Sequence, residues 1–114
     1  MAQPRFLDDP AFRCLRIGDF AGFNREAAGF KEIDFSNADL RGVDLRGIAD
    51  LTKLVVRGAY MRDTDLRGLD LREWDMEGCS LYHAKISGAY FPTNLSPQEI
   101  TVSVQLGTRM RTSR

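Results

Sequence analysis

Apolar residues recur at every fifth position between Ala28 and Thr93, and one extra residue, Ile48, interrupts the period. A period of five matches neither the 3.6-residue helix nor the two-residue strand, so the chain has to turn once in every five residues. The residue at the centre of each five is apolar in all thirteen cases. These predicted core residues are Phe30, Phe35, Leu40, Leu45, Leu51, Val56, Met61, Leu66, Leu71, Met76, Leu81, Ile86 and Phe91.

The other positions of each five are patterned as well. The first is mostly small or aliphatic and lies two residues before the centre, so an extended step points both side chains to the same side. Asp precedes the centre in seven fives, Arg follows it in six, and Gly ends six. An Asp carboxylate can bond nearby backbone amides at a corner, and Gly tolerates corner dihedrals. Two inward positions and one polar corner predict a closed, four-sided coil whose turns stack about every twenty residues.

The triplets Ala38-Asp39-Leu40 and Ala49-Asp50-Leu51 resemble the A(D/N)Lxx consensus of the pentapeptide-repeat family, here as a small bacterial member. The resemblance covers residues 28–93. It implies an all-β solenoid, a right-handed quadrilateral parallel β-helix of about three coils, capped by short helical segments at both ends.

Stacking at this spacing makes specific demands on three residues. Thr64 falls in an inward column, so its hydroxyl has to bond a backbone carbonyl. Trp74 is large for such a core and needs a partner for its indole N–H. The extra residue Ile48 is expected to bulge outward at a corner.

Both flanks are predicted to be caps, because a stacked coil leaves unpaired backbone at each end. Residues 1–27 are predicted to be an N-terminal helical cap, with helix starts at Asp9-Pro10 and at Asp19. Residues 94–114 are predicted to be a C-terminal helical cap or dimerisation segment with a basic tail. The aromatic residues expected in the core of the first cap are Phe12, Phe20 and Phe23.

The C-terminal flank carries two signals. Ser96, Pro97 and Glu99 form a helix start with a capping box, and Gly107 is a helix stop. Against this, Ile100, Val102, Val104 and Leu106 alternate with a strand period. The start chemistry favours a helix, on which two of these four residues face the barrel and two face away. The outward pair motivates homodimerisation through this segment, with these four residues as the candidate dimer contacts; the alternative is a segment folded flat over one barrel.

Composition narrows the functional classes. The 114 residues include 16 Lys plus Arg and 16 Asp plus Glu, so the formal net charge is zero. Neutrality argues against binding nucleic acid or membranes by bulk charge. No apolar run approaches the roughly 20 residues of a membrane span, and the N-terminus has no signal-peptide core, so we expect a cytoplasmic location.

Candidate chemistry is sparse. His83 is the one histidine and is expected to be an exposed corner residue. Cys79 falls in an inward column and Cys14 in the helical cap, so neither is expected to be a nucleophile. No metal-ligand spacing, phosphate loop or nucleophile–base motif is present. The sequence therefore predicts no enzyme, and no catalytic, cofactor-binding or metal-binding residues.

A binding or structural module that contacts an unknown protein partner is the favoured function. Outward aromatic and arginine residues are typical interface anchors, and here the candidates are Tyr60, Arg62, Tyr82 and Tyr90. The alternative for the tyrosines is that they merely cover barrel corners.

The second function considered is DNA mimicry, because some pentapeptide-repeat proteins resemble DNA and bind type II topoisomerases, protecting them from quinolones. Residues 28–93 contain 11 acidic and 9 basic residues. Three turns span about 15 Å at sheet spacing, and that length of B-DNA carries about 9 negative charges. The charge and the short barrel disfavour this alternative.

Overall fold

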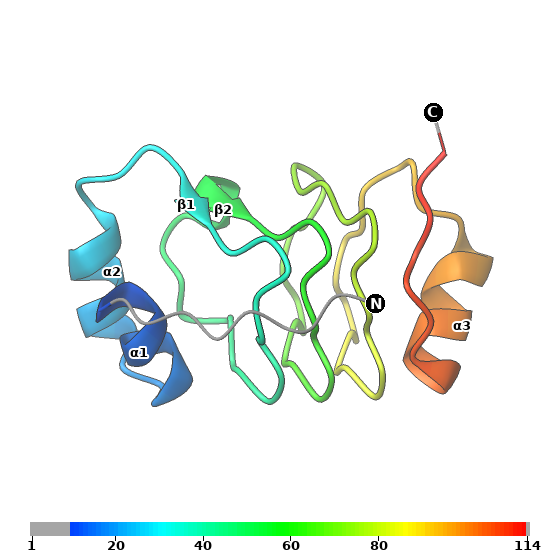
Figure 1. Ribbon diagram of the computed structural model, residues 1–114, viewed down its shortest axis with the longest axis horizontal. Helices are drawn as coiled ribbons and strands as arrows, with labels where there is room; N and C mark the ends of the chain where they lie inside the picture. Colours follow the sequence, from blue (N-terminus) through cyan, green and yellow to red (C-terminus); the bar gives the residue numbers. More distant parts are fainter. Residues whose placement is uncertain (1–9, 114) are drawn as a thin grey trace.

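The structure is a computed structural model that describes residues 10–113. Its elements in chain order are helices α1 (Pro10–Arg16) and α2 (Phe20–Ala27), strand β1 (Ile33–Asp34), the 3-10 turn η1 (Leu51–Lys53), strand β2 (Leu54–Val55) and helix α3 (Pro97–Leu106). A stack of coils occupies the middle of the molecule, with α1 and α2 at one end and α3 at the other (Figure 1).

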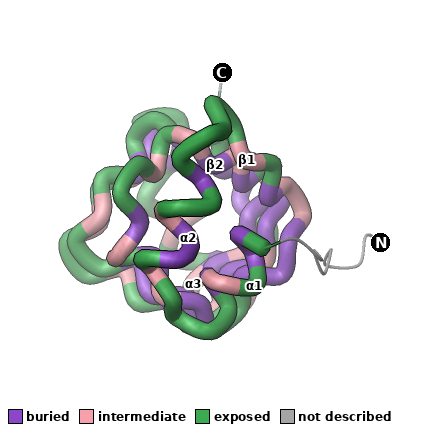
Figure 2. The backbone as a smooth tube through the Cα atoms, turned by 90° about the vertical axis from the view of Figure 1, so that its left-hand side faces the viewer, coloured by how far each residue is buried: buried purple, intermediate pink, exposed green. Residues whose placement is uncertain are grey.

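Parallel pairing between successive turns holds the coils together. Strand β1 pairs with β2 in the register Ile33 to Leu54, and the other parallel contacts are isolated bridges. One bridge joins Asp39 to Tyr60, and the next joins Tyr60 to Ser80, so each step along the stack advances the chain by about four fives. Seen from the α1 and α2 end, buried and exposed residues alternate along the coils (Figure 2).

The step from Asp39 to Tyr60 is one residue longer than the step from Tyr60 to Ser80, so the extra residue lies in the first of these turns. The prediction that Ile48 bulges outward is nevertheless wrong. Ile48 is 9% exposed, and its amide donates to the Leu45 carbonyl at 3.4 Å, a bond that Val43 also makes to Leu40. Ile48 therefore takes an ordinary inward place, and the 3-10 turn η1 absorbs the additional residue within 49–53.

Burial of the thirteen predicted core residues varies with their place in the stack. Nine are buried, and Leu51, Ile86 and Phe91 are half-buried. The prediction for Phe30 is wrong, because its side chain is 59% exposed. Phe30 lies in the link between α2 and β1, before parallel pairing starts at Ile33, so no turn of the coil closes around it. The buried centres are Phe35, Leu40, Leu45, Val56, Met61, Leu66, Leu71, Met76 and Leu81.

The two polar groups predicted to lie in the core, the Thr64 hydroxyl and the Trp74 indole N–H, both have hydrogen-bond partners. The Thr64 hydroxyl, fully buried, donates to the Leu40 carbonyl at 2.6 Å. The Trp74 indole N–H donates to the Leu51 carbonyl at 2.8 Å. Both groups bond to backbone of the preceding turn, so they satisfy their own polarity and also link adjacent turns.

Two short helices cover the first turn of the coil. Asp19 caps α2, because its carboxylate accepts a hydrogen bond from the Gly22 amide at 2.9 Å. Phe12 and Phe23 are buried and pack against the ring of Phe35. Phe20 is half-buried over Gly47. The predicted cap residue Asp9 and the rest of residues 1–9 lie outside the described residues.

The C-terminal segment is a helix followed by an extended strand-like tail, so the alternation in residues 100–106 does not mark a strand. The Ser96 hydroxyl accepts from the Glu99 amide, and Gly107 ends α3 with a φ of 76°. After the helix the chain returns beside the last turn of the coil (Figure 1), where Arg109 forms an antiparallel bridge with Ser80. Met110, in the predicted basic tail, is fully buried.

Among the described residues, no helix has the length and apolar character that crossing a membrane requires.

Candidate interaction surface

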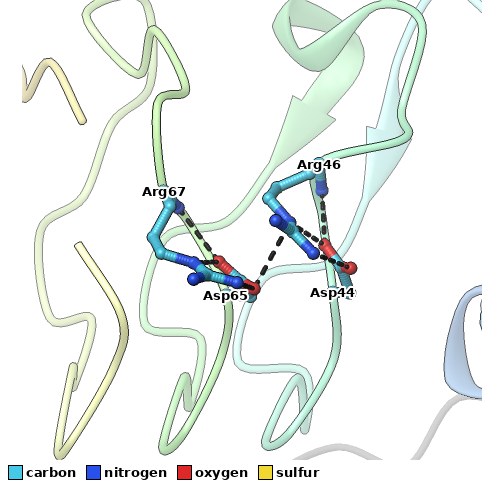
Figure 3. Close-up of polar contacts among 4 residues, drawn as sticks. All are labelled: Asp44, Arg46, Asp65 and Arg67. Atoms are coloured by element: carbon cyan, nitrogen blue, oxygen red, sulfur yellow. Dashed lines mark hydrogen bonds and ion pairs between the residues drawn. The ribbon is translucent and has the colours of Figure 1, made fainter. Parts of the chain in front are cut away.

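Four of the thirteen fives in residues 28–93 present a closed ion pair, between the Asp before the centre and the Arg after it, to solvent. In the five that contains Asp44, the carboxylate accepts from the Arg46 amide at 2.9 Å and from the Arg46 guanidinium at 3.0 and 3.1 Å. Asp65 and Arg67 repeat this arrangement one turn later, as Figure 3 shows. Arg46 also reaches across to Asp65, with its Nε 3.3 Å from the carboxylate. Asp before the centre therefore closes the corner and neutralises the Arg that follows the centre.

These contacts shift the acidity of the carboxylates. Hydrogen bonds from the Arg67 side chain lower the pKa of Asp65 to about 2. The equivalent bonds from Arg72 lower the pKa of Asp70 to about 2. The carboxylates are thus ionised and engaged across the neutral range, which leaves them little capacity for acid–base chemistry.

The five made of residues 59–63 differs from these four, because Tyr60 stands at the place before the centre where they have Asp. Arg62 consequently has no carboxylate two residues before it. Its nearest acidic partner is the adjacent Asp63, at 3.7 Å from Nε, and its guanidinium lies over the ring of Tyr82, 5.1 Å from the centroid.

Arg109, from the extended tail, completes this surface. Its guanidinium lies 4.8 Å from the centroid of the Tyr60 ring and donates hydrogen bonds to the Tyr60 hydroxyl and, at 3.3 Å, to the Gly78 carbonyl. Sequence reasoning did not single out Arg109 as an interaction residue. The polar–apolar–polar order of Arg109, Met110 and Arg111 was the available signal, because such alternation is typical of an extended edge.

We call the group formed by Tyr60, Arg62, Tyr82 and Arg109 the tyrosine–arginine surface. The parallel bridge from Tyr60 to Ser80 and the antiparallel bridge from Ser80 to Arg109 bring its parts together. His83 adjoins it, since its ring stacks on Tyr82 at 3.9 Å.

Tyr90, the fourth predicted contact residue, lies elsewhere. It bridges to Asp70, and the guanidinium of Arg72 lies 5.2 Å from its ring centroid. Arg72 is also paired with Asp70 at 2.8 Å. The structure therefore brings Tyr60, Arg62 and Tyr82 together but places Tyr90 on a different side of the coil.

The sulfur and imidazole groups have structural surroundings. Cys79 is fully buried, its thiol donates to the Val56 carbonyl at 3.0 Å, and burial raises its pKa to about 12. His83 is exposed at a corner with a left-handed φ of 57°. Within residues 10–113, no cluster of three or more His, Cys, Asp or Glu side chains could hold a metal ion.

The four predicted dimer-contact residues lie on two faces of α3. Ile100 and Val104 are half-buried and pack against the core, while Val102 is 40% and Leu106 is 73% exposed. The buried Ser103 anchors the helix, because its hydroxyl accepts from the Leu81 amide at 2.9 Å and donates to the Thr108 carbonyl at 2.7 Å.

Comparison with known proteins gives one match. The family described as "Pentapeptide repeats" matches residues 28–53 and 59–92, in eight copies. No curated protein and no solved structure matches the chain.

Proposed function

Because this chain belongs to the pentapeptide-repeat family, we propose that it is a non-enzymatic binding module that contacts a protein partner through the tyrosine–arginine surface. The observation that carries the proposal is the substitution of Tyr60 for the usual Asp. It removes the intra-turn partner of Arg62 and leaves solvent-accessible tyrosine and arginine side chains together at one place. Tyr and Arg are among the residue types enriched at the energetic centres of protein interfaces.

The scaffold we propose is the right-handed, four-sided parallel β-helix implied by the family. Its support is the regular parallel register, in which paired positions lie about four fives apart, together with the inward places of residues such as Leu45 and Leu66. A rigid coil of this kind holds side chains of adjacent turns at the roughly 4.8 Å spacing of a sheet, which suits a fixed recognition surface.

The surroundings of the reactive groups support a function without catalysis. The Cys79 thiol is buried, and burial holds its pKa far above neutrality. Several carboxylates of the coil are engaged by arginine, as Asp70 is by Arg72 at 2.8 Å. The same ion pairs argue against DNA mimicry, because a paired carboxylate does not present the unbroken negative charge of a phosphate backbone.

We also propose that the outward face of α3 pairs with the same face of a second copy. Val102 and Leu106 are exposed apolar side chains four residues apart, so they form one stripe on the helix. A two-fold contact would bring the stripe of one copy against the identical stripe of the other.

Affinity capture tests the partner-binding role. Wild-type protein and a Tyr60→Ala, Arg62→Ala variant are compared as baits, with Arg72→Ala as the matched control. Arg72 also lies over a tyrosine ring but is closed by Asp70. We expect a partner that wild type and the Arg72→Ala variant retain and the double variant loses. Identical partner lists for all three baits would reject the role of this surface.

Light scattering tests the dimer. Wild type is expected to have twice the mass of a Leu106→Glu variant at micromolar concentration, and Gln105→Glu, on the exposed polar part of the helix, is expected to behave as wild type. A 12.9 kDa particle for wild type would reject the dimer.

A further inference from the structure

The arginines of the repeat, together with Arg109 of the tail, divide into two groups by their partners. Arg46, Arg57 and Arg72 each lie within 3.0 Å of a carboxylate, and two others do likewise. Arg62 and Arg109 differ from these within residues 10–113, because no carboxylate lies that close to either guanidinium. The remaining paired arginines are Arg41 and Arg67, each 2.7 Å from its aspartate.

The guanidiniums of Arg62 and Arg109 are nevertheless held in place by aromatic rings. Arg62 lies over the Tyr82 ring, and Arg109 lies over the Tyr60 ring while bonding its hydroxyl. A guanidinium that is oriented by an aromatic face keeps its charge and its outward N–H donors, and it loses less side-chain entropy when a carboxylate arrives. This is the arrangement of a preorganised carboxylate receptor.

One further arginine adds positive charge to the immediate surroundings. Arg41 lies one turn away, since the Gly42 amide next to it donates to the Arg62 carbonyl at 2.7 Å, but its own guanidinium is paired with Asp39 at 2.7 Å. Arg16, from α1, donates to the Arg41 carbonyl at 2.6 Å and so brings a further guanidinium to this side of the coil. Arg109 also lines a cleft of about 360 Å³ whose wall includes Asn37, Arg57 and Glu77, and the Glu77 carboxylate accepts hydrogen bonds from Thr112.

We infer that the tyrosine–arginine surface recognises an acidic peptide segment of its protein partner, with Arg62 and Arg109 as the residues that bind its carboxylates. The inference rests on the proposed protein-binding role. It goes further in naming the chemistry of the partner.

Two observations favour an acidic peptide over a nucleic acid. Guanidiniums already cover a face of the Tyr60 and Tyr82 rings, whereas binding of single strands relies on bases stacking on open aromatic faces. A duplex, moreover, is bound through many simultaneous phosphate contacts, and a chain with a formal net charge of zero is poorly suited to supply them.

Fluorescence anisotropy with a labelled hexaglutamate peptide tests the inference on the full chain. We expect binding that weakens as salt is added, and a loss of about fivefold for Arg62→Gln and for Arg109→Gln, the size of one exposed ion pair. Arg72→Gln is the matched control and is expected to bind as wild type. Tyr60→Asp should also weaken binding, because the new carboxylate would occupy Arg62 as Asp70 occupies Arg72. Thermal melting of each variant verifies that the fold is retained.

The contrary results are distinct. Absence of hexaglutamate binding, an equal loss in the Arg72→Gln variant, or tighter binding of inorganic phosphate or a single-stranded oligonucleotide would each overturn the inference. If hexaglutamate fails to bind while partner capture still depends on Tyr60 and Arg62, the acidic-peptide assignment falls and the protein-binding role stands. If the Arg62-dependent binding of hexaglutamate is present but the captured partners are identical, the protein-binding role falls and the acid selectivity of the surface stands.

Discussion

The indole nitrogen of Trp74 donates a hydrogen bond to the carbonyl of Leu51, 2.8 Å away in the preceding turn. Leu51 begins η1, the 3-10 turn that absorbs the additional residue of the first complete coil. The largest side chain of the core therefore supports the one turn whose length departs from the repeat. Trp74 is only 4% exposed, so the bond forms at the edge of the apolar interior.

Removing this bond is expected to weaken the fold. Trp74→Phe keeps an aromatic ring in the core but deletes the donor and some volume, so we expect a loss of about 1–3 kcal/mol in the free energy of unfolding. Chemical denaturation monitored by far-UV circular dichroism measures it. Tyr90→Phe is the control, because Tyr90 is 61% exposed and its change should stay within about 0.5 kcal/mol. Equal stability of wild type and Trp74→Phe would contradict the role assigned to the indole.

Ser103 provides a second prediction, at the opposite cap. Its buried hydroxyl accepts a hydrogen bond from the Leu81 amide of the last coil and donates one to the Thr108 carbonyl of the tail. Ser103→Ala would leave a buried amide without its acceptor, at a cost of about 1–3 kcal/mol. Hydrogen exchange should show faster exchange at the Leu81 amide in this variant, whereas Ser87→Ala, at an exposed position, should leave it unchanged. Unaltered protection of Leu81 would show that the hydroxyl does not hold the cap.

The repeat region could be predicted from the sequence, because its period of five reflects the same local pattern in every turn. Asp at the corner, the bonded hydroxyl of Thr64 and the helix start at Ser96 each depend on residues close in sequence or on simple stacking, and all are found in the structure. The prediction for Phe30 was wrong because the repeat was extended one five toward the N-terminus, before the residue at which parallel pairing begins. The predicted bulge at Ile48 was wrong because the count of residues shows that a turn is one residue longer but does not show which residue the turn displaces.

The tail lay beyond such reasoning. Met110 is buried and Arg109 covers Tyr60 only because the chain reverses after Gly107 and pairs with Ser80, which is distant in the sequence. Nothing local in the tail specifies that pairing. Three residues of the tyrosine–arginine surface, Tyr60, Arg62 and Tyr82, could therefore be predicted from the sequence. The fourth, Arg109, could be identified only from the tertiary structure.

The lowered pKa of Asp65 makes a prediction about acid stability. Its pKa in the folded protein is about 2, below the ordinary value of 3.8, so the folded state binds this proton less readily than the unfolded chain. The resulting stabilisation is complete above the ordinary pKa and is lost as the pH falls from about 5 through 2. Asp65→Asn should melt at a lower temperature at pH 7 and lose less stability on acidification than wild type.

The control for this pH experiment is Asp63→Asn. Asp63 is exposed, and its left-handed φ of 60° suits Asn, so this matched Asp-to-Asn change should leave the melting temperature at pH 7 as in wild type. Parallel melting curves for Asp65→Asn and wild type across this pH range would refute the stabilising role of the Asp65 carboxylate.

The last prediction concerns Gly58, where both the backbone conformation and a neighbouring side chain disfavour a Cβ atom. Its φ is +73°, and a Cβ there would lie 2.3 Å from the side-chain oxygen of Asn37. Gly68 has nearly the same φ, +72°, but open space around it. Gly68→Ala should therefore cost only the backbone strain, about 1–2 kcal/mol, and Gly58→Ala about 1 kcal/mol more for the displaced neighbour. Denaturation midpoints compare the two, and repeating Gly58→Ala in an Asn37→Gly background should bring its cost down to that of Gly68→Ala. If the excess persists without the Asn37 side chain, a cause other than that contact makes glycine necessary at position 58.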